Sequence, residues 1–341
     1  MANVHAHSFG LNRARTVRVS ALLAVALAVF SMLSLVFGSS EIPCADIFSA
    51  LFFGGENETA KLVLWEIRLP RLCAAMLCGS SLAVAGVGMQ SLFRNPLADP
   101  SVTGVSSGAA LGAVIAMTFF GSVVSGEILA LVFGLGAAFA VCSTGSAFSR
   151  NSVYSVLLAG IAVNAFCGAL VGFFMYTVRD AGMRGFVFWS LGSLERCGWA
   201  ELAAAFALCV PSQILVYTQS RAMNLLLLGE ESAFHGGVDV RRVRLCVIAA
   251  SAVMTAACVS ICGIIGFVGL VVPHILRMLT TPDNRTLVPL SALGGALLLT
   301  FSDVAARAVS QTDPVPIGVI TALLGAPFFA FLLKSKGLGN G

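Results

Sequence analysis

The sequence predicts an all-α, polytopic membrane protein with ten transmembrane helices in the chain and both termini in the cytoplasm. Three observations support this class. Hydrophobic residues make up 58% of the 341 positions, charged residues make up only 11%, and the apolar residues fall in long runs separated by short polar segments. Soluble domains carry roughly 25% charged residues. So few charges cannot cover a soluble globule, which argues against a cytoplasmic enzyme, a disordered tail or a nucleic-acid-binding protein.

Ten apolar runs are the predicted membrane spans. A helix needs about 20 apolar residues to cross a bilayer, and charged residues or Gly and Pro clusters mark the ends of each run. An even number of spans leaves both chain ends on the same side. The runs cover residues 19–37, 72–93, 101–120, 127–148, 153–176, 199–217, 244–262, 265–279, 287–308 and 316–333.

The few charges sort to two sides of this arrangement. Arg13, Arg15 and Arg18 precede the first run, whereas segment 38–66 after it holds five acidic residues and only one basic residue, Lys61. Cytoplasmic loops carry an excess of Lys and Arg, which places the N-terminus in the cytoplasm. With alternating sides, 13 of the 20 Lys and Arg residues are cytoplasmic. The chain is expected to be one transmembrane domain, 1–341, with cytoplasmic segments at 1–18, 218–243 and 334–341.

The ten cysteines do not predict a metal site. Eight lie inside apolar runs, where a thiol behaves as a small hydrophobic group, and only Cys44 and Cys197 lie in connecting segments. No pair of Cys or His residues has the spacing of zinc ligands. We therefore expect structural cysteines and no bound metal.

The sequence also predicts no nucleotide-binding site that could supply energy for transport. Only three lysines occur, Lys61, Lys334 and Lys336, and none lies in the G-x-x-x-x-G-K-[ST] loop that binds nucleotide phosphates. We expect no catalytic residue, no ATPase motif and no cofactor in this chain. A pump of this kind would take its energy from an ion gradient or from another subunit.

Small residues recur at four-residue spacing on two of the predicted helices. Such spacing lets helix backbones approach closely in lipid, and we interpret the first stripe as helix packing. The second stripe includes an asparagine at mid-membrane depth, where a polar side chain faces a bundle interior or a water path. Packing and the lining of a transport pathway both remain open for it. The stripes are Gly104, Gly108 and Gly112, and Gly160, Asn164, Gly168 and Gly172.

Four further motifs identify a family. They are Arg-Leu-Pro-Arg at 68–71, Asn-Pro-Leu-Ala-Asp-Pro at 95–100, the glycine-rich segment 265–277, and the Pro-Val-Pro-Ile-Gly motif at 314–318 followed by Gly-Ala-Pro at 325–327. In order and spacing they resemble the FecCD-type permeases, the membrane subunits of ATP-driven importers for cobalamin, haem and iron-siderophore complexes. The resemblance covers roughly residues 60–335. It implies a ten-helix bundle that works as a dimer in the bacterial inner membrane.

The resemblance also implies roles for individual residues at the outer face. In the family's cobalamin importers, the two arginines of the first motif and an arginine near the end of the ninth helix pair with glutamates of the binding protein. These positions match Arg68, Arg71 and Arg307. A guanidinium group offers a planar fork to a carboxylate, so these residues are predicted to dock the binding protein.

At the inner face the resemblance implies a gate and a coupling segment. Asn95 and Leu97 match residues that narrow the inner end of the channel, and the asparagine could also cap the next helix, a role that is compatible with gating. A second constriction is expected near residues 152–154. The loop 225–240 resembles the helix that inserts into the ATPase. Its coupling residues are Gly229, Glu230, Glu231 and Ala233.

The predicted function is that of the permease subunit of a binding-protein-dependent ABC importer. It would move an iron chelate such as a siderophore by alternating access, with haem and cobalamin as rival substrates. The implied partners are a second permease subunit, two cytoplasmic ATPase subunits that bind ATP and Mg, an extracytoplasmic binding protein and the lipid bilayer, with no nucleic acid.

Two other classes compete with this prediction. A gradient-driven secondary transporter would need carboxylates or histidines within the membrane, and the predicted spans hold few away from their ends. An intramembrane protease would need a dyad such as Ser106 with His274, because Gly104 to Gly108 matches the G-x-S-x-G pattern. In this sequence the pattern lies at the start of a predicted apolar helix. No acidic residue is placed to orient the histidine.

Overall fold

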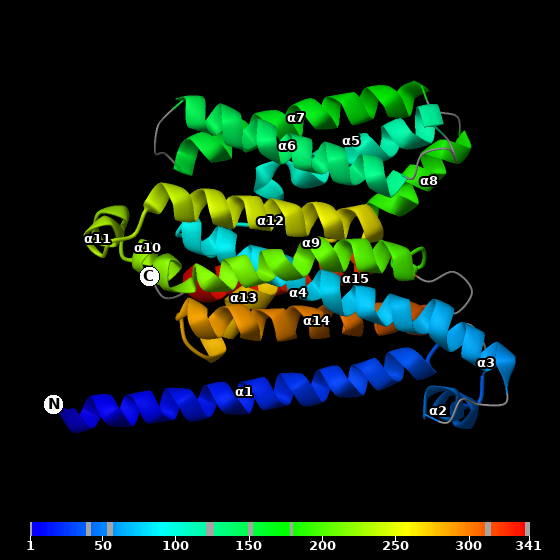
Figure 1. The fold of residues 1–341 in the computed structure, drawn as a ribbon, viewed down its shortest axis with the longest axis horizontal. Helices are drawn as coiled ribbons and strands as arrows, with labels where there is room; N and C mark the ends of the chain where they lie inside the picture. The colour runs from blue at the N-terminus through cyan, green and yellow to red at the C-terminus, as the bar shows by residue number, and fades with distance from the viewer. Residues whose placement is uncertain are drawn as a thin grey trace.

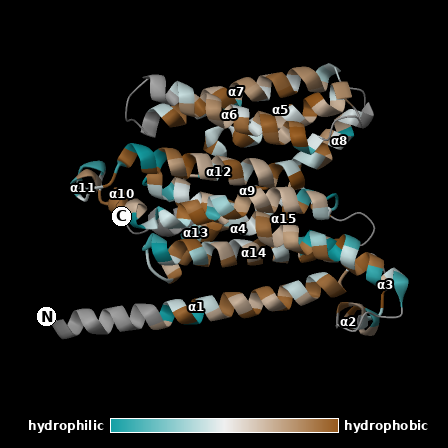
Figure 2. Ribbon diagram, viewed as in Figure 1, coloured by the Kyte–Doolittle hydropathy of each residue, from teal (hydrophilic) through white to brown (hydrophobic). Residues whose placement is uncertain are grey.

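The computed structural model describes residues 2–38, 42–52, 57–120, 126–148, 153–177, 180–310 and 315–337. Over these residues the chain forms long helices that run roughly parallel, and it forms no strand (Figure 1). Two of them lie on opposite sides of the bundle, α1 (Ala2–Val36) and α7 (Val153–Thr177). Hydrophilic residues gather at its two ends, and hydrophobic residues dominate between them (Figure 2). The predicted all-α membrane class is confirmed.

Each predicted run coincides with an apolar helix of the described chain. Seven helices are long and apolar enough to cross a membrane, and three apolar helices are shorter. Crossing by those three, and therefore the number of ten spans, stays a prediction. The longer elements are α1, α4 (Leu69–Leu92), α6 (Gly126–Phe148), α7, α9 (Trp199–Thr218), α12 (Val240–Cys262) and α14 (Asn284–Val309). The others are α5 (Val105–Ile115) with the π-helical turn η3 (Ala116–Phe120), α13 (Val268–Leu279) and α15 (Ile317–Gly337).

Shorter helices occupy the connecting segments at both ends of the bundle. They were not predicted from the sequence, except for a short helix in the inner loop. They are α2 (Cys44–Phe52), α3 (Glu58–Leu62), the 3-10 turn η2 (Pro100–Thr103), α8 (Asp180–Ser190), α10 (Ser220–Leu227) and α11 (Glu230–His235).

The second span begins earlier than the predicted range 72–93. Helical structure starts at Glu58 and continues without a break to the end of α4. The π-helical turn η1 (Val63–Arg68) lies directly before Pro70, which stands in the first turn of α4. Proline has no N–H to donate to the carbonyl of Glu66, and it tends to break a helix. A wider π turn accommodates that missing bond, so the helix passes through the proline.

α4 is the central helix of the bundle. Of the 18 most apolar consecutive residues in the continuous helix from Glu58 to Leu92, 83% are buried. Backbones touch at two levels: a Cβ on Gly79 would collide with the carbonyl of Gly295 in α14, and one on Gly86 would collide with the carbonyl of Gly269 in α13. Close approach of this kind maximises van der Waals contact in lipid. α13 and α14 are therefore held directly against the α4 backbone.

α12 separates α4 from a second layer that contains α5, α6 and α7 (Figure 1). A Cβ on Gly108 would collide with the backbone of Phe133, and one on Gly112 with the carbonyl of Leu129. Both partners belong to α6. The predicted packing role of the first stripe is therefore confirmed for Gly108 and Gly112, whereas Gly104 precedes α5 with a left-handed φ of 79°.

α1 stands at the edge of the bundle. Of its 18 most apolar consecutive residues, only 6% are buried. Phe30 meets Phe301 of α14 edge-to-face, with ring centroids 5.1 Å apart. α1 therefore contacts the bundle along one side, mainly through α14.

Candidate functional site

Asp303 lies between two arginines at the end of α14. The Nε of Arg71 donates to one carboxylate oxygen at 2.8 Å, and Nη2 of Arg307 donates to the other at 2.7 Å. Asp303 is fully buried. Because each oxygen accepts a charge-assisted hydrogen bond, this carboxylate joins α4 to α14 at that end of the bundle.

The same cluster caps the end of α1. Nη1 of Arg68 donates to the carbonyls of Leu35 and Val36 at 2.5 and 2.9 Å. Arg307 donates to the carbonyl of Ser34 at 3.0 Å and also to that of Phe37. The last four carbonyls of a helix have no partner within the helix, and they carry partial negative charge. Guanidinium groups satisfy those of Ser34, Leu35 and Val36, and that of Leu33 accepts the N–H of Phe37, so the arginine cluster holds the end of α1.

The structure thus brings together all three predicted docking arginines. Arg68 and Arg307 are 5% and 8% exposed, and the side chain of Arg71 is 11% exposed. Nη1 of Arg71 lies 3.9 Å from the carboxylate of Glu195, which is half exposed. Their internal bonds do not test the docking role, which stays a prediction. They show a structural role that was not predicted from the sequence.

At the other end of α4, Asn95 closes a tight turn on itself. Its Oδ1 accepts the N–H of Leu97 at 2.9 Å, and Arg94 before it has a left-handed backbone with φ of 48°. Leu97 is 48% exposed. The next helical element, η2, is capped by Asp99, whose Oδ1 accepts the N–H of Ser101 at 2.9 Å. The interpretation that Asn95 also caps the next helix is therefore wrong, because Asp99 does so, and its gating role stays a prediction.

The second stripe of small residues divides into two parts. A Cβ on Gly160 would collide with the carbonyl of Val102, and Nδ2 of Asn164 donates weakly to the carbonyl of Ser101 at 3.4 Å. This half of the stripe packs on η2. Gly168 and Gly172 are exposed, and a Cβ at either would meet nothing within 4 Å. Gly168 and Gly172 therefore have open space beside them, and the lining of a pathway by the four residues of this stripe stays a prediction.

The predicted coupling loop forms two short helices, α10 and α11. Gly229 joins them with φ of 120°, a conformation that favours glycine. Glu230 forms an ion pair with Arg244 of α12 at 2.7 Å, and Ala233 is fully buried. Glu231 is exposed.

Two large apolar side chains of this loop face outward. Leu228 is 73% exposed and Phe234 is 72% exposed. Their helices, α10 and α11, lie at a hydrophilic end of the bundle (Figure 2). Exposed apolar groups rimmed by polar residues mark protein interfaces.

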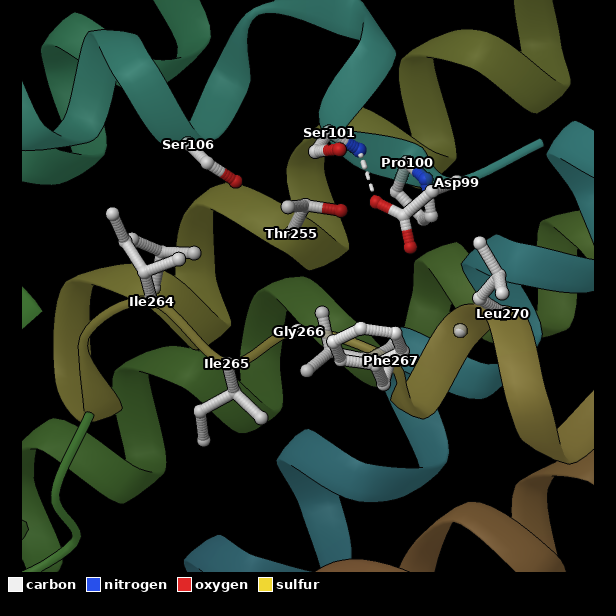
Figure 3. Close-up of a pocket in the computed structure, with 13 residues that line it drawn as sticks. Asp99, Pro100, Ser101, Ser106, Thr255, Ile264, Ile265, Gly266, Phe267 and Leu270 are labelled. Carbon is white, nitrogen blue, oxygen red and sulfur yellow. Dashed lines mark hydrogen bonds between the residues drawn. The ribbon is translucent and has the colours of Figure 1, made fainter. Parts of the chain in front are cut away.

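A cavity of about 340 Å³ lies next to the Asn95 turn. Figure 3 shows the hydroxyls of Ser106 and Thr255 on one side and the segment Ile264 to Leu270 on the other. Phe267 in that segment has a left-handed backbone with φ of 70°. The cavity therefore combines a polar wall with an apolar wall close to the predicted gate.

His274 does not line this cavity. It is buried inside α13 and packs against Phe328 and Phe329 of α15, with ring centroids 6.3 and 6.4 Å apart. Ser106 and His274 thus have different surroundings. The structure offers no support for a serine protease dyad.

No candidate metal centre occurs among the described residues. They contain no group of three or more His, Cys, Asp and Glu side chains arranged to hold an ion. Cys197, in the segment before α9, is buried, and this burial raises the pKa of its thiol to about 12. A thiol that stays neutral at physiological pH is a poor ligand and a poor nucleophile.

Comparison with known proteins assigns the family. The sequence model of the FecCD transport family matches residues 22–335. The chain belongs to the FecCD transport family. It is 40% identical over 326 residues to the hemin transport system permease protein HmuU of Yersinia pestis, covering 93% of this chain and 96% of HmuU. It is also 40% identical over 331 residues to the cobalamin import system permease protein BtuC of Halobacterium salinarum, covering 94% and 89% of the two chains.

A solved structure of an ABC transporter of the metal-chelate type, in an inward-facing conformation, has the same fold. The TM-score is 0.81 at 32% identity, with 92% of this chain and 97% of that chain covered. This FecCD chain is therefore a membrane-embedded permease subunit of an ABC importer.

The role of Asp303 in this FecCD permease was not predicted from the sequence. Asp303 is an acidic residue inside an apolar run, four positions before Arg307. A carboxylate within a membrane span is expensive unless it is paired, and residues four apart meet on a helix. This combination could have identified the pair. Its link to Arg71, across 232 positions of sequence, had no sequence signal.

The Asp303 cluster gives the first testable prediction. Replacing Asp303 by Ala should destabilise the purified permease by about 3–5 kcal/mol, because it leaves two buried guanidinium groups without their carboxylate. Thermal unfolding in detergent measures the change. The control is Glu58→Ala, which removes the exposed pair of Glu58 with Lys61. Surface pairs contribute about 0–1 kcal/mol. Equal unfolding temperatures for both variants would contradict the assigned role.

Proposed function

We propose that this chain forms the translocation pathway of a binding-protein-dependent importer that carries an iron chelate, such as a siderophore, into the bacterial cytoplasm. The observation that carries the proposal is the FecCD match over residues 22–335. A relative named for hemin, another named for cobalamin and a neighbour of the metal-chelate type support a large chelated cargo. Haem and cobalamin remain the rival cargoes.

The energy would come from two ATPase subunits that bind ATP and Mg at the inner face. The exposed Phe234 and Leu228 give α10 and α11 an apolar surface outside the lipid. Glu230 holds α11 against α12 through Arg244. Gly229 permits the sharp turn between the helices, and Glu231 adds an exposed charge. In this proposal the loop docks in the ATPase and moves with it.

A second copy of the chain would complete the pathway. The exposed face of α7 carries Ile161 in line with the open Gly168 and Gly172, and exposed Phe166 and Phe173 lie toward its other edge. An apolar face with small residues suits close contact between helices. A homodimer with α7 of each copy along the pathway follows from this face and from the family. The inner gate would then be formed by Asn95 and Leu97.

The binding protein would dock at the arginine cluster. Arg71 and Arg307 bind the buried carboxylate of Asp303, and Arg68 donates to carbonyls at the end of α1, so three guanidinium groups gather at this end of the bundle. Acidic side chains on a partner would be attracted to these groups, and Glu195 shows that a carboxylate can approach Arg71 from the exposed side. Docking, ATP binding and hydrolysis would then alternate access between the two faces.

The energy source is the second testable prediction. Proteoliposomes should contain the permease, its neighbouring ATPase and the binding protein. We expect accumulation of a radiolabelled ferric chelate only with ATP and Mg on the ATPase side, and an uncoupler should leave it unchanged. Uptake without ATP that collapses with the uncoupler would contradict the proposal and favour a gradient-driven transporter.

The region near residues 152–154, expected to form a second constriction, includes side chains outside the described residues.

The ATPase surface is the third testable prediction. Phe234→Ala should lower the amount of ATPase that co-purifies with the permease by at least about tenfold, since truncating a large buried aromatic at an interface costs 2 kcal/mol or more. The matched control is Phe139→Ala on α6, because Phe139 is 74% exposed and Phe234 is 72% exposed. An equal yield of ATPase with both variants would exclude α11 as the docking helix.

A further inference from the structure

A row of polar side chains runs through the inner part of the bundle, from α10 to the turn at Asn95. Neither the family match nor the relatives' names give these side chains a role. The row is buried or half buried in an otherwise apolar region, so each member has a cost unless it is hydrogen-bonded. Its members are Gln90 and Ser91 of α4, Asn224 of α10, Arg277 of α13, and Asp283 and Asn284 at the start of α14.

The first link joins the coupling loop to α14. Nδ2 of Asn224 donates to the carboxylate of Asp283 at 2.6 Å, and its Oδ1 accepts the backbone N–H of Asn284 at 2.9 Å. Asp283 also caps α14 by accepting the N–H of Arg285 at 3.0 Å. An amide can donate and accept at the same time. Asn224 therefore holds α10 to the N-terminus of α14 with both of its polar groups.

The second link joins α14 to α4. Oδ1 of Asn284 accepts the hydroxyl of Ser91 at 3.0 Å, and Asn284 is fully buried. Its Nδ2 has no hydrogen-bond partner among the described residues. A buried polar network that is only partly satisfied is less stable than a complete one. This conformation therefore leaves one donor of the row available for a different arrangement.

The third link ends at the predicted gate. The side chain of Gln90 accepts from Nη1 of Arg277 at 3.1 Å and donates to the carbonyls of Gly269 and Leu270 at 3.3 Å. The backbone carbonyl of Gln90 accepts the N–H of Asn95 at 3.2 Å. Gln90 thus connects α13 to the turn that presents Leu97.

We propose that Asn224 is a positioning residue that transmits movement of α10 and α11 to the Asn95 turn. This inference rests on the proposed function, because it assumes that the loop docks in an ATPase. A displacement of α10 pulls on the first turn of α14 through Asn224, and α14 is bonded to α4 beside Gln90. The gate then responds to the ATPase through hydrogen bonds and rigid helices, without contact between the ATPase and the turn.

A charge-swapped pair separates this role from simple structural support. N224D alone sets two carboxylates against each other. In N224D/D283N the amide and the carboxylate exchange places, so the link between α10 and α14 is restored, and the new Asn can still cap α14. The control is Arg285→Gln, because Arg285 is exposed and its side chain is not in the row.

The experiment measures chelate imported per ATP hydrolysed in proteoliposomes of the full complex. For N224D we expect this ratio to fall at least about tenfold while ATPase co-purification and ATP turnover stay within about twofold. N224D/D283N should recover to within about threefold of the wild type, and Arg285→Gln should match the wild type.

An unchanged ratio in N224D would overturn the inference. So would equal losses of import and ATP hydrolysis, because Asn224 would then only support the fold. If N224D does not assemble, the swap decides: an assembled, coupled N224D/D283N supports the inference, and an assembled, uncoupled one overturns it. A wild-type complex that imports without ATP would instead refute the proposed function, and the inference with it.

Discussion

The contact of three helix backbones at glycine is the constraint on which the rest of the molecule depends. Gly79 of α4 meets Gly295 of α14, and Gly86 meets Gly269 of α13, without room for a methyl group. Side chains cannot adjust such a contact, so α4, α13 and α14 form one unit. The arginine cluster lies at one end of this unit, and the row from Asn224 to Asn95 lies at the other. Both candidate sites therefore share a single rigid support.

The two ends use polar groups in different ways. At the end with the arginine cluster, Arg71 and Arg307 bind the buried carboxylate of Asp303, and Arg68 and Arg307 bind the last carbonyls of α1. These hydrogen bonds all have a charged donor. At the opposite end most of the bonds join neutral amides, hydroxyls and backbone groups. Such bonds have a modest net strength, so they can exchange during a transport cycle, whereas the arginine cluster is suited to stay intact.

The sequence predicted the class and the position of each apolar helix, because lipid requires long apolar runs and tolerates few charges. It missed the start of the second span, where Glu58, Lys61 and Glu66 read as a loop. In the structure these residues belong to a helix that carries Arg68 into the bundle. The three arginines were found by their family motif, but their shared carboxylate was not. The inner row had no signal either, because Gln90, Asn224 and Asn284 are far apart in sequence and show no periodicity.

The most direct test is a distance measurement along the rigid unit during the ATP cycle. Nitroxide side chains introduced as unnatural amino acids at Leu62 and Met278, both exposed, report on the helix that runs from α3 into α4 relative to α13, and a pair at Met278 and Phe166 reports on α7. In the assembled complex, electron paramagnetic resonance should give the same Leu62 to Met278 distance with and without ATP. The Met278 to Phe166 distance should change. An ATP-dependent change between Leu62 and Met278 would contradict the account.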